Sequence, residues 1–166
     1  MTYNTLFLCT GNSARSVLAE AILNDLGCGR FRAFSAGSHP SGRVNPFALE
    51  LLTARGHPVT GLGSKSWDEF AAGPANPDPP NMGFIITVCD NAAGAACPLW
   101  PGHPATAHWG VEDPATVEGS DADKRAAFLQ AYAILRRRIE AFLLLPLETL
   151  DPAAAKTRLQ GIGSLP

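Results

Sequence analysis

The chain has 166 residues, of which 46% are hydrophobic and 17% charged, and its formal net charge is −2. This is the composition of a soluble globular protein with one core, and it excludes a general electrostatic attraction to nucleic acid or anionic membranes. No stretch approaches the roughly 18 continuous apolar residues of a membrane helix, and the first residues lack the basic segment of a secretory signal. We therefore expect one cytoplasmic domain over residues 1–166, monomeric and without nucleic-acid or membrane partners.

Strand and helix patterns alternate along the chain. Short apolar runs predict strands at residues 4–8, 31–36, 84–88 and 105–109. Apolar side chains at helical spacing predict helices at residues 14–26, 46–55, 64–72, 121–144 and 151–159. This alternation with short connections predicts an α/β fold, in which right-handed crossovers join a parallel sheet covered by helices on both faces.

Three consecutive arginines, Arg136, Arg137 and Arg138, lie within the longest predicted helix and at first sight resemble a nucleic-acid-binding patch. Arginines on an amphipathic helix more often form a solvated face. We therefore expect all three side chains to be exposed.

The connection between the first strand and the first helix carries most of the chemical information. Cys9 follows the strand and Arg15 opens the helix, with only small residues between them. Successive N–H groups of such a loop can converge on one tetrahedral oxyanion, and the helix N-terminus and the guanidinium add positive charge. The residues expected to bind the oxyanion are Thr10, Gly11, Asn12, Ser13, Ala14, Arg15 and Ser16.

A sulfur at the base of this cradle is expected to ionise easily, so Cys9 is predicted to be a nucleophile at neutral pH. Hydrogen bonds from Ser13 and Ser16 are expected to hold the thiolate and lower its pKa. Asn12 is expected to pin the strained turn of the loop.

Four cysteines lie at positions 9, 28, 89 and 97. In a cytoplasmic chain with this loop they suggest redox chemistry rather than structural disulfides, and the absence of a close pair makes zinc a weaker interpretation. Cys9 and Cys89 both follow predicted parallel strands, whose carboxyl ends share one edge of the sheet. The two thiols are therefore predicted to lie on one rim, whereas Cys28, at a helix end, is interpreted as having no role.

Several segments resemble a known family. Residues 9–16, Cys-Thr-Gly-Asn-Ser-Ala-Arg-Ser, resemble the nucleophile loop of the low-molecular-weight protein tyrosine phosphatase superfamily. Residues 87–92, Thr-Val-Cys-Asp-Asn-Ala, 97–101, Cys-Pro-Leu-Trp-Pro, and 108–115, His-Trp-Gly-Val-Glu-Asp-Pro-Ala, resemble the arsenate reductases built on that fold. The resemblance covers nearly the whole chain and implies a three-layer fold with a four-stranded parallel sheet flanked by helices.

The resemblance also implies a mechanism, arsenate reduction by a thiol relay. Cys9 would attack arsenate held by the loop and Arg15, while Asp113 protonates the departing oxygen. Cys89 would then attack the Cys9 sulfur and release arsenite, and Cys97 would move the disulfide to the Cys89–Cys97 pair. Thioredoxin, or a glutaredoxin and glutathione system, would reduce that pair, so no organic cofactor is expected.

Two other functions stay open. A phosphatase would use the same nucleophile, arginine and acid to hydrolyse phosphomonoesters through a phosphocysteine, with water in place of Cys89. A non-enzymatic oxyanion-binding domain would need only the loop. Ala14 stands where many phosphatases of this superfamily carry a second cysteine, and Ala115 where tyrosine phosphatases commonly place aromatic residues. Both departures favour a small inorganic oxyanion over a phosphopeptide.

The cysteines and histidines predict no transition-metal site. Some arsenate reductases of this fold bind a potassium ion behind the loop. Oxygen ligands of the kind that such a site needs are offered here by Asn12, Glu20, Ser35, Ser66 and Asp68. Lys65 offers an alternative, because its ammonium group could supply the positive charge itself.

Overall fold

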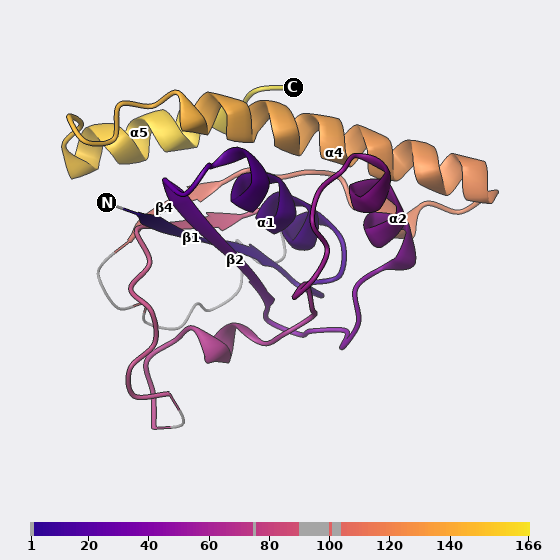
Figure 1. Ribbon diagram of the computed structural model, residues 1–166, viewed down its shortest axis with the longest axis horizontal. Helices are drawn as coiled ribbons and strands as arrows, with labels where there is room; N and C mark the ends of the chain where they lie inside the picture. The colour runs from indigo at the N-terminus through magenta and orange to yellow at the C-terminus, as the bar shows by residue number, and fades with distance from the viewer. Residues whose placement is uncertain (1, 75, 90–99, 101–103) are drawn as a thin grey trace.

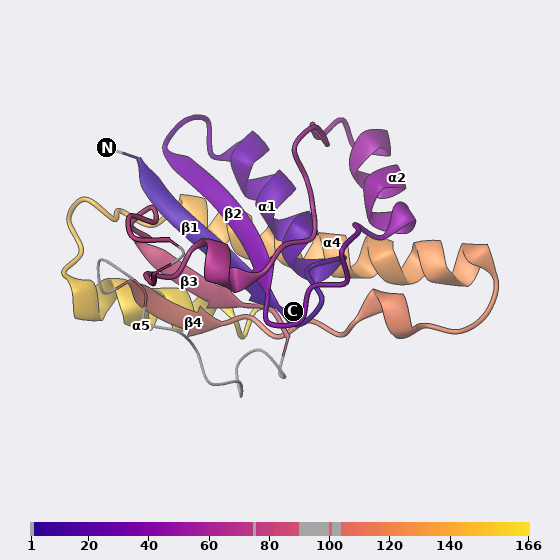
Figure 2. The ribbon, with the colours of Figure 1, turned by 90° about the horizontal axis from the view of Figure 1, so that it is seen from below.

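The fold is seen in a computed structural model that describes residues 2–74, 76–89, 100 and 104–166 (Figure 1). Its strands are β1 (Tyr3–Cys9), β2 (Phe31–Gly37), β3 (Phe84–Thr87) and β4 (Ala105–His108). They form one parallel sheet in the order β2-β1-β3-β4, seen from below in Figure 2. The predicted four-stranded parallel sheet is thereby confirmed.

The longer helices begin where the sequence places a capping residue or the loop arginine. They are α1 (Arg15–Leu26), α2 (Pro46–Ala54), α4 (Asp121–Leu143) and α5 (Pro152–Ile162). Side-chain oxygens of Asn45, Ser120 and Asp151 accept backbone N–H groups in the first turns of α2, α4 and α5. Such caps satisfy otherwise unpaired donors, so these starts agree closely with the predicted ones.

The helix predicted over residues 64–72 is wrong. The structure has only a 3-10 turn there, η1 (Trp67–Glu69). The backbone before it is extended, because Ser66 pairs with Gly37 at the end of β2 and the Gly37 N–H donates to the Lys65 carbonyl. This pairing with the sheet replaces the hydrogen bonds that a helix would have made.

Helices α1, α4 and α5 pack on the same face of the sheet (Figure 1). The core between them contains the fully buried Phe7, Ile86, Trp109 and Phe142. On the opposite face, the apolar side chains of Leu6, Leu8 and Ile85 pack with residues from η1 and the loop that follows it. Among the described residues, that face is therefore covered by a turn and loops.

No helix in the described part of the chain is long and apolar enough to cross a membrane.

Arg138 corrects a second prediction, because its side chain is buried. Its guanidinium donates hydrogen bonds to the carbonyls of Gly110 and Leu165. Arg138 lies at helical spacing from the buried Leu135 and Phe142, whereas Arg137 is exposed. Successive residues on a helix are turned by about 100°, so three consecutive arginines cannot share one exposed face.

Candidate active site

The loop after β1 is held from behind by Asn12. Its side chain is fully buried, donates to the Ser16 hydroxyl over 2.8 Å and accepts from the Lys65 N–H over 2.9 Å. Asn12 has φ +46°, a left-handed conformation that Asn tolerates better than most residues. This geometry agrees with the expectation that Asn12 pins the turn.

The direction of the loop peptides follows from their carbonyl groups. The carbonyls of Thr10, Gly11 and Ser13 accept hydrogen bonds from the backbone N–H groups of residues 39, 41 and 45. A trans peptide points its N–H opposite to its carbonyl. The N–H groups of Gly11, Asn12 and Ala14, which share peptides with these carbonyls, therefore point away from residues 39, 41 and 45. Gly37 makes the close approach possible, since a Cβ there would lie 2.4 Å from the Thr10 carbonyl oxygen. This orientation is compatible with an oxyanion cradle on the opposite side of the loop.

Arg15 joins this loop to the segment after β4. One terminal nitrogen donates to the Val111 carbonyl over 2.9 Å, and the other lies 3.2 Å from a carboxylate oxygen of Asp113. Its Nε is buried and has no hydrogen-bond partner within the part of the chain that the structure describes. Such a donor beside the cradle is suited to an incoming oxyanion.

Asp113 is partly exposed and also caps the short 3-10 helix η2 (Pro114–Thr116), accepting the Ala115 N–H over 2.9 Å. The turn-forming and catalytic interpretations of this residue are therefore compatible. A cleft of about 550 Å³ brings together the predicted arginine, acid and second thiol. Its lining residues are Arg15, Cys89, Gly110, Val111, Glu112, Asp113 and Thr116.

The structure brings Cys9 and Cys89 together, as predicted from their places after β1 and β3. Both side chains are buried, and the neighbouring Cys89 thiol has the largest influence on the pKa of Cys9. The Thr10 N–H also donates to the Cys89 sulfur over 3.3 Å, across 79 residues of sequence. Cys97 lies outside the described residues.

The surroundings of Cys9 raise the pKa of its thiol, so the predicted lowering is wrong. The largest cause is the hydrogen bond with Cys89, and burial raises the pKa further. The charge of Arg15 and the Thr10 N–H act in the opposite direction and do not outweigh these effects. The prediction of a lowered pKa considered only groups in the loop and left out the effect of the Cys89 thiol, which follows β3 and is distant in sequence.

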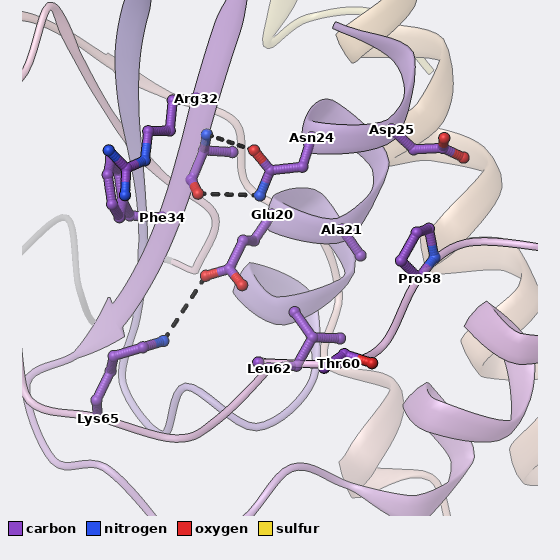
Figure 3. Close-up of a pocket in the computed structure, with 12 residues that line it drawn as sticks. Glu20, Ala21, Asn24, Asp25, Arg32, Phe34, Pro58, Thr60, Leu62 and Lys65 are labelled. Carbon is purple, nitrogen blue, oxygen red and sulfur yellow. Dashed lines mark hydrogen bonds and ion pairs between the residues drawn. The ribbon is translucent and has the colours of Figure 1, made fainter. Parts of the chain in front are cut away.

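Behind the loop, Lys65 points toward Glu20, one of the expected potassium ligands (Figure 3). Its ammonium group donates to the Ser35 carbonyl over 2.9 Å and lies 3.7 Å from a carboxylate oxygen of Glu20. Burial raises the pKa of Glu20, and the positive charge of Lys65 opposes that rise. Ser66 instead caps η1 through the Asp68 N–H. This geometry favours the alternative in which Lys65 supplies the positive charge.

Comparison with known proteins places the chain in a family. Residues 4–155 match the family model of the low molecular weight phosphotyrosine protein phosphatases. The chain belongs to this family. The match includes the Cys9 loop, Cys89 and Asp113, and it ends within α5.

Proteins similar to this chain include arsenate reductases. That of Halalkalibacterium halodurans is 33% identical over 136 residues, which are 82% of this chain and 91% of that protein. A solved arsenate reductase in its phosphate-binding state is 25% identical with a TM-score of 0.63, over 85% of this chain and 96% of that one. The arsenate reductase of Archaeoglobus fulgidus is 26% identical with a TM-score of 0.57, over 82% and 98% of the two chains.

Proposed function

We propose that this chain reduces arsenate to arsenite and is regenerated by an external thiol reductant, for which thioredoxin is our first candidate. The observation that carries the proposal is that the buried Cys9 and Cys89 lie together at the loop, where the N–H of Thr10, next to Cys9, donates to the Cys89 sulfur over 3.3 Å. Reduction of arsenate needs two electrons, and two adjacent thiols supply them by forming a disulfide. The arsenate reductases among the relatives support the same assignment.

In the first step, the loop N–H groups and Arg15 hold arsenate, the Cys9 thiol gives its proton to a bound arsenate oxygen, and its sulfur attacks the arsenic atom. A sulfur–arsenic bond forms and an arsenic–oxygen bond breaks. Asp113, which lies 3.2 Å from Arg15, gives a proton to the departing oxygen, which leaves as water. Arsenic is still pentavalent at this stage.

In the second step, the Cys89 sulfur attacks the Cys9 sulfur. The electron pair of the sulfur–arsenic bond stays on arsenic, which leaves as arsenite, while the two thiols become a disulfide. The Thr10 N–H that contacts Cys89 would stabilise the attacking thiolate. Cys97 then attacks Cys89 and frees Cys9, and the reductant opens the Cys89–Cys97 disulfide.

Phosphatase activity is the second candidate. The same loop, Arg15 and Asp113 would form and hydrolyse a phosphocysteine on Cys9, and the family match favours this chemistry. Phosphate and arsenate are both tetrahedral oxyanions, so one cradle can bind either. Only the reductase needs the second thiol at Cys89.

The test compares arsenate-dependent NADPH oxidation with hydrolysis of para-nitrophenyl phosphate. The first assay supplies thioredoxin and thioredoxin reductase, and a parallel reaction supplies glutathione and glutaredoxin. Cys9→Ser is expected to abolish both activities, whereas Cys89→Ser abolishes reduction and spares hydrolysis. Cys28→Ser, which removes an exposed thiol, is the matched control and keeps both. Arsenate reduction that persists in Cys89→Ser would refute the relay.

A further inference from the structure

Two arginines from different helices hold successive carbonyl groups just before Asp113. Arg15, at the start of α1, donates to the Val111 carbonyl over 2.9 Å. Arg138, near the end of α4, donates to the Gly110 carbonyl over 3.1 Å. Arg15 holds the oxyanion in the proposed mechanism, whereas Arg138 has no role in it.

Arg138 also ties this segment to the end of the chain. Its Nε donates to the Leu165 carbonyl over 3.0 Å, and its side chain is almost fully buried. The helix before Leu165 is fixed nearby, because the Trp109 indole donates to the Leu159 carbonyl over 2.9 Å. Close packing continues at Gly163, where a Cβ would lie 2.4 Å from the His108 carbonyl oxygen. Both Leu165 and Gly163 lie beyond the part of the chain that matches the family.

We propose that Arg138 is a positioning residue for proton transfer by Asp113. It anchors the backbone at Gly110 to α4 and to the segment after α5, so that Asp113, three residues later, keeps its place beside Arg15. The inference rests on the proposed role of Asp113 as general acid. Its physical basis is that a general acid works only within hydrogen-bond reach of the departing oxygen, and a displacement of about 1 Å can slow a reaction by about 10²-fold.

The first test replaces Arg138 with Met, which keeps an unbranched side chain of similar length and removes both hydrogen bonds. With arsenate, kcat is expected to fall by about 10–100-fold while KM stays within about two-fold, because the oxyanion loop and Arg15 are intact. Arg137→Met is the matched control. Arg137 is the exposed neighbour of Arg138 and donates to the Pro166 carbonyl, not to the backbone before Asp113. It should leave kcat and KM unchanged. A rise in KM alone, or an unchanged kcat in Arg138→Met, would overturn the proposal.

A double-mutant cycle separates positioning from a general effect on the fold. In an Asp113→Asn background, Arg138→Met should change kcat by less than about two-fold, because the group that it positions is already disabled. If the fold-losses in kcat of Arg138→Met and Asp113→Asn multiply in the double variant instead, Arg138 does not act through Asp113. Arg138→Lys keeps the charge but lacks the fork that reaches two carbonyls, so an intermediate kcat is expected. Should Arg138→Met fail to fold, the Lys variant is used for the cycle.

Failure of this inference can be told apart from failure of the proposed function. If the wild-type chain hydrolyses para-nitrophenyl phosphate and does not reduce arsenate, the reductase proposal fails. The same cycle is then measured on hydrolysis, which uses the same acid. If the wild type reduces arsenate and the losses multiply, only the role of Arg138 is refuted.

Discussion

At the scale of single residues, the Cys9 thiol depends on its partner more than on its loop. A lone cysteine at a helix N-terminus would lose its proton readily. Here the Cys89 thiol is the largest cause that raises the pKa of Cys9, and two adjacent sulfurs resist carrying two negative charges. The same proximity that raises the pKa of Cys9 is what the proposed relay requires of Cys89.

Removing the Cys89 thiol should therefore make Cys9 more reactive. In Cys89→Ala the largest cause of the raised pKa is gone, so the thiolate of Cys9 should form at lower pH. The measurement is the pH dependence of Cys9 alkylation by iodoacetamide, followed by peptide mass spectrometry, with Cys28→Ala as the control. A midpoint that does not move to lower pH in Cys89→Ala would contradict this account.

Lys65 is expected to be needed at neutral pH. Because burial raises the pKa of Glu20, the folded chain loses stability as the pH rises from the ordinary pKa of a glutamate towards the raised value, and Lys65 reduces that loss. Lys65→Met should lower the free energy of unfolding by about 1–3 kcal/mol at pH 7. The loss should shrink towards pH 5, where the folded chain can protonate Glu20. Urea unfolding at both pH values checks this, with the exposed Lys156→Met as control.

The same lysine bears on the potassium hypothesis. If its ammonium group supplies the positive charge behind the loop, arsenate reduction should be equal in KCl and NaCl at the same ionic strength. A wild-type rate that is higher in KCl would instead support a potassium ion near Asn12, Glu20 and Ser35.

At the scale of elements, a buried histidine links three helices. His57, after α2, bonds Asp25 of α1 over 2.6 Å through Nδ1 and the Tyr132 hydroxyl of α4 over 2.5 Å through Nε2. The Tyr132 hydroxyl also accepts a hydrogen bond from Arg136, one turn along α4. These polar contacts fix how α1, α2 and α4 meet, because each buried group would be left unsatisfied if the helices shifted.

Tyr132→Phe removes one link of this network. The free energy of unfolding is expected to fall by about 1–3 kcal/mol, since a ring nitrogen of His57 stays buried without its partner. Tyr3→Phe, at the other tyrosine, is the control and should change stability by less than about 0.5 kcal/mol. Neither residue lines the active-site cleft, so kcat should be unchanged in both variants.

At the scale of the whole molecule, α5 completes the core on the sheet face that carries α1 and α4 (Figure 2). Leu159 is fully buried there, and its carbonyl holds the Trp109 indole. Leu159→Ala is expected to lower the free energy of unfolding by about 2–5 kcal/mol because it leaves a cavity. Leu144→Ala is the control, since that side chain is 84% exposed, and should change it by less than about 0.5 kcal/mol. Thermal unfolding of both variants distinguishes a core helix from a loosely attached one.

Prediction from sequence succeeded where the determining groups are neighbours in the chain. The strand runs, the capped starts of α2 and α4, and the small-residue loop from Cys9 to Arg15 are local patterns, so their type and approximate bounds could be read directly. It failed at residues 64–72, where pairing with the end of β2 overrode a weak helical pattern.

By itself, the sequence indicated four parallel strands, the small-residue loop from Cys9 to Arg15 and the placing of Cys9 and Cys89 at one edge, because the alternation of strands and helices and the loop composition are local patterns. Only the tertiary structure decided the raised pKa of Cys9 and the burial of Arg138. Both depend on groups distant in sequence that folding brings within hydrogen-bond distance. At that range and out of contact with water, one partner outweighs the intrinsic tendency of the residue.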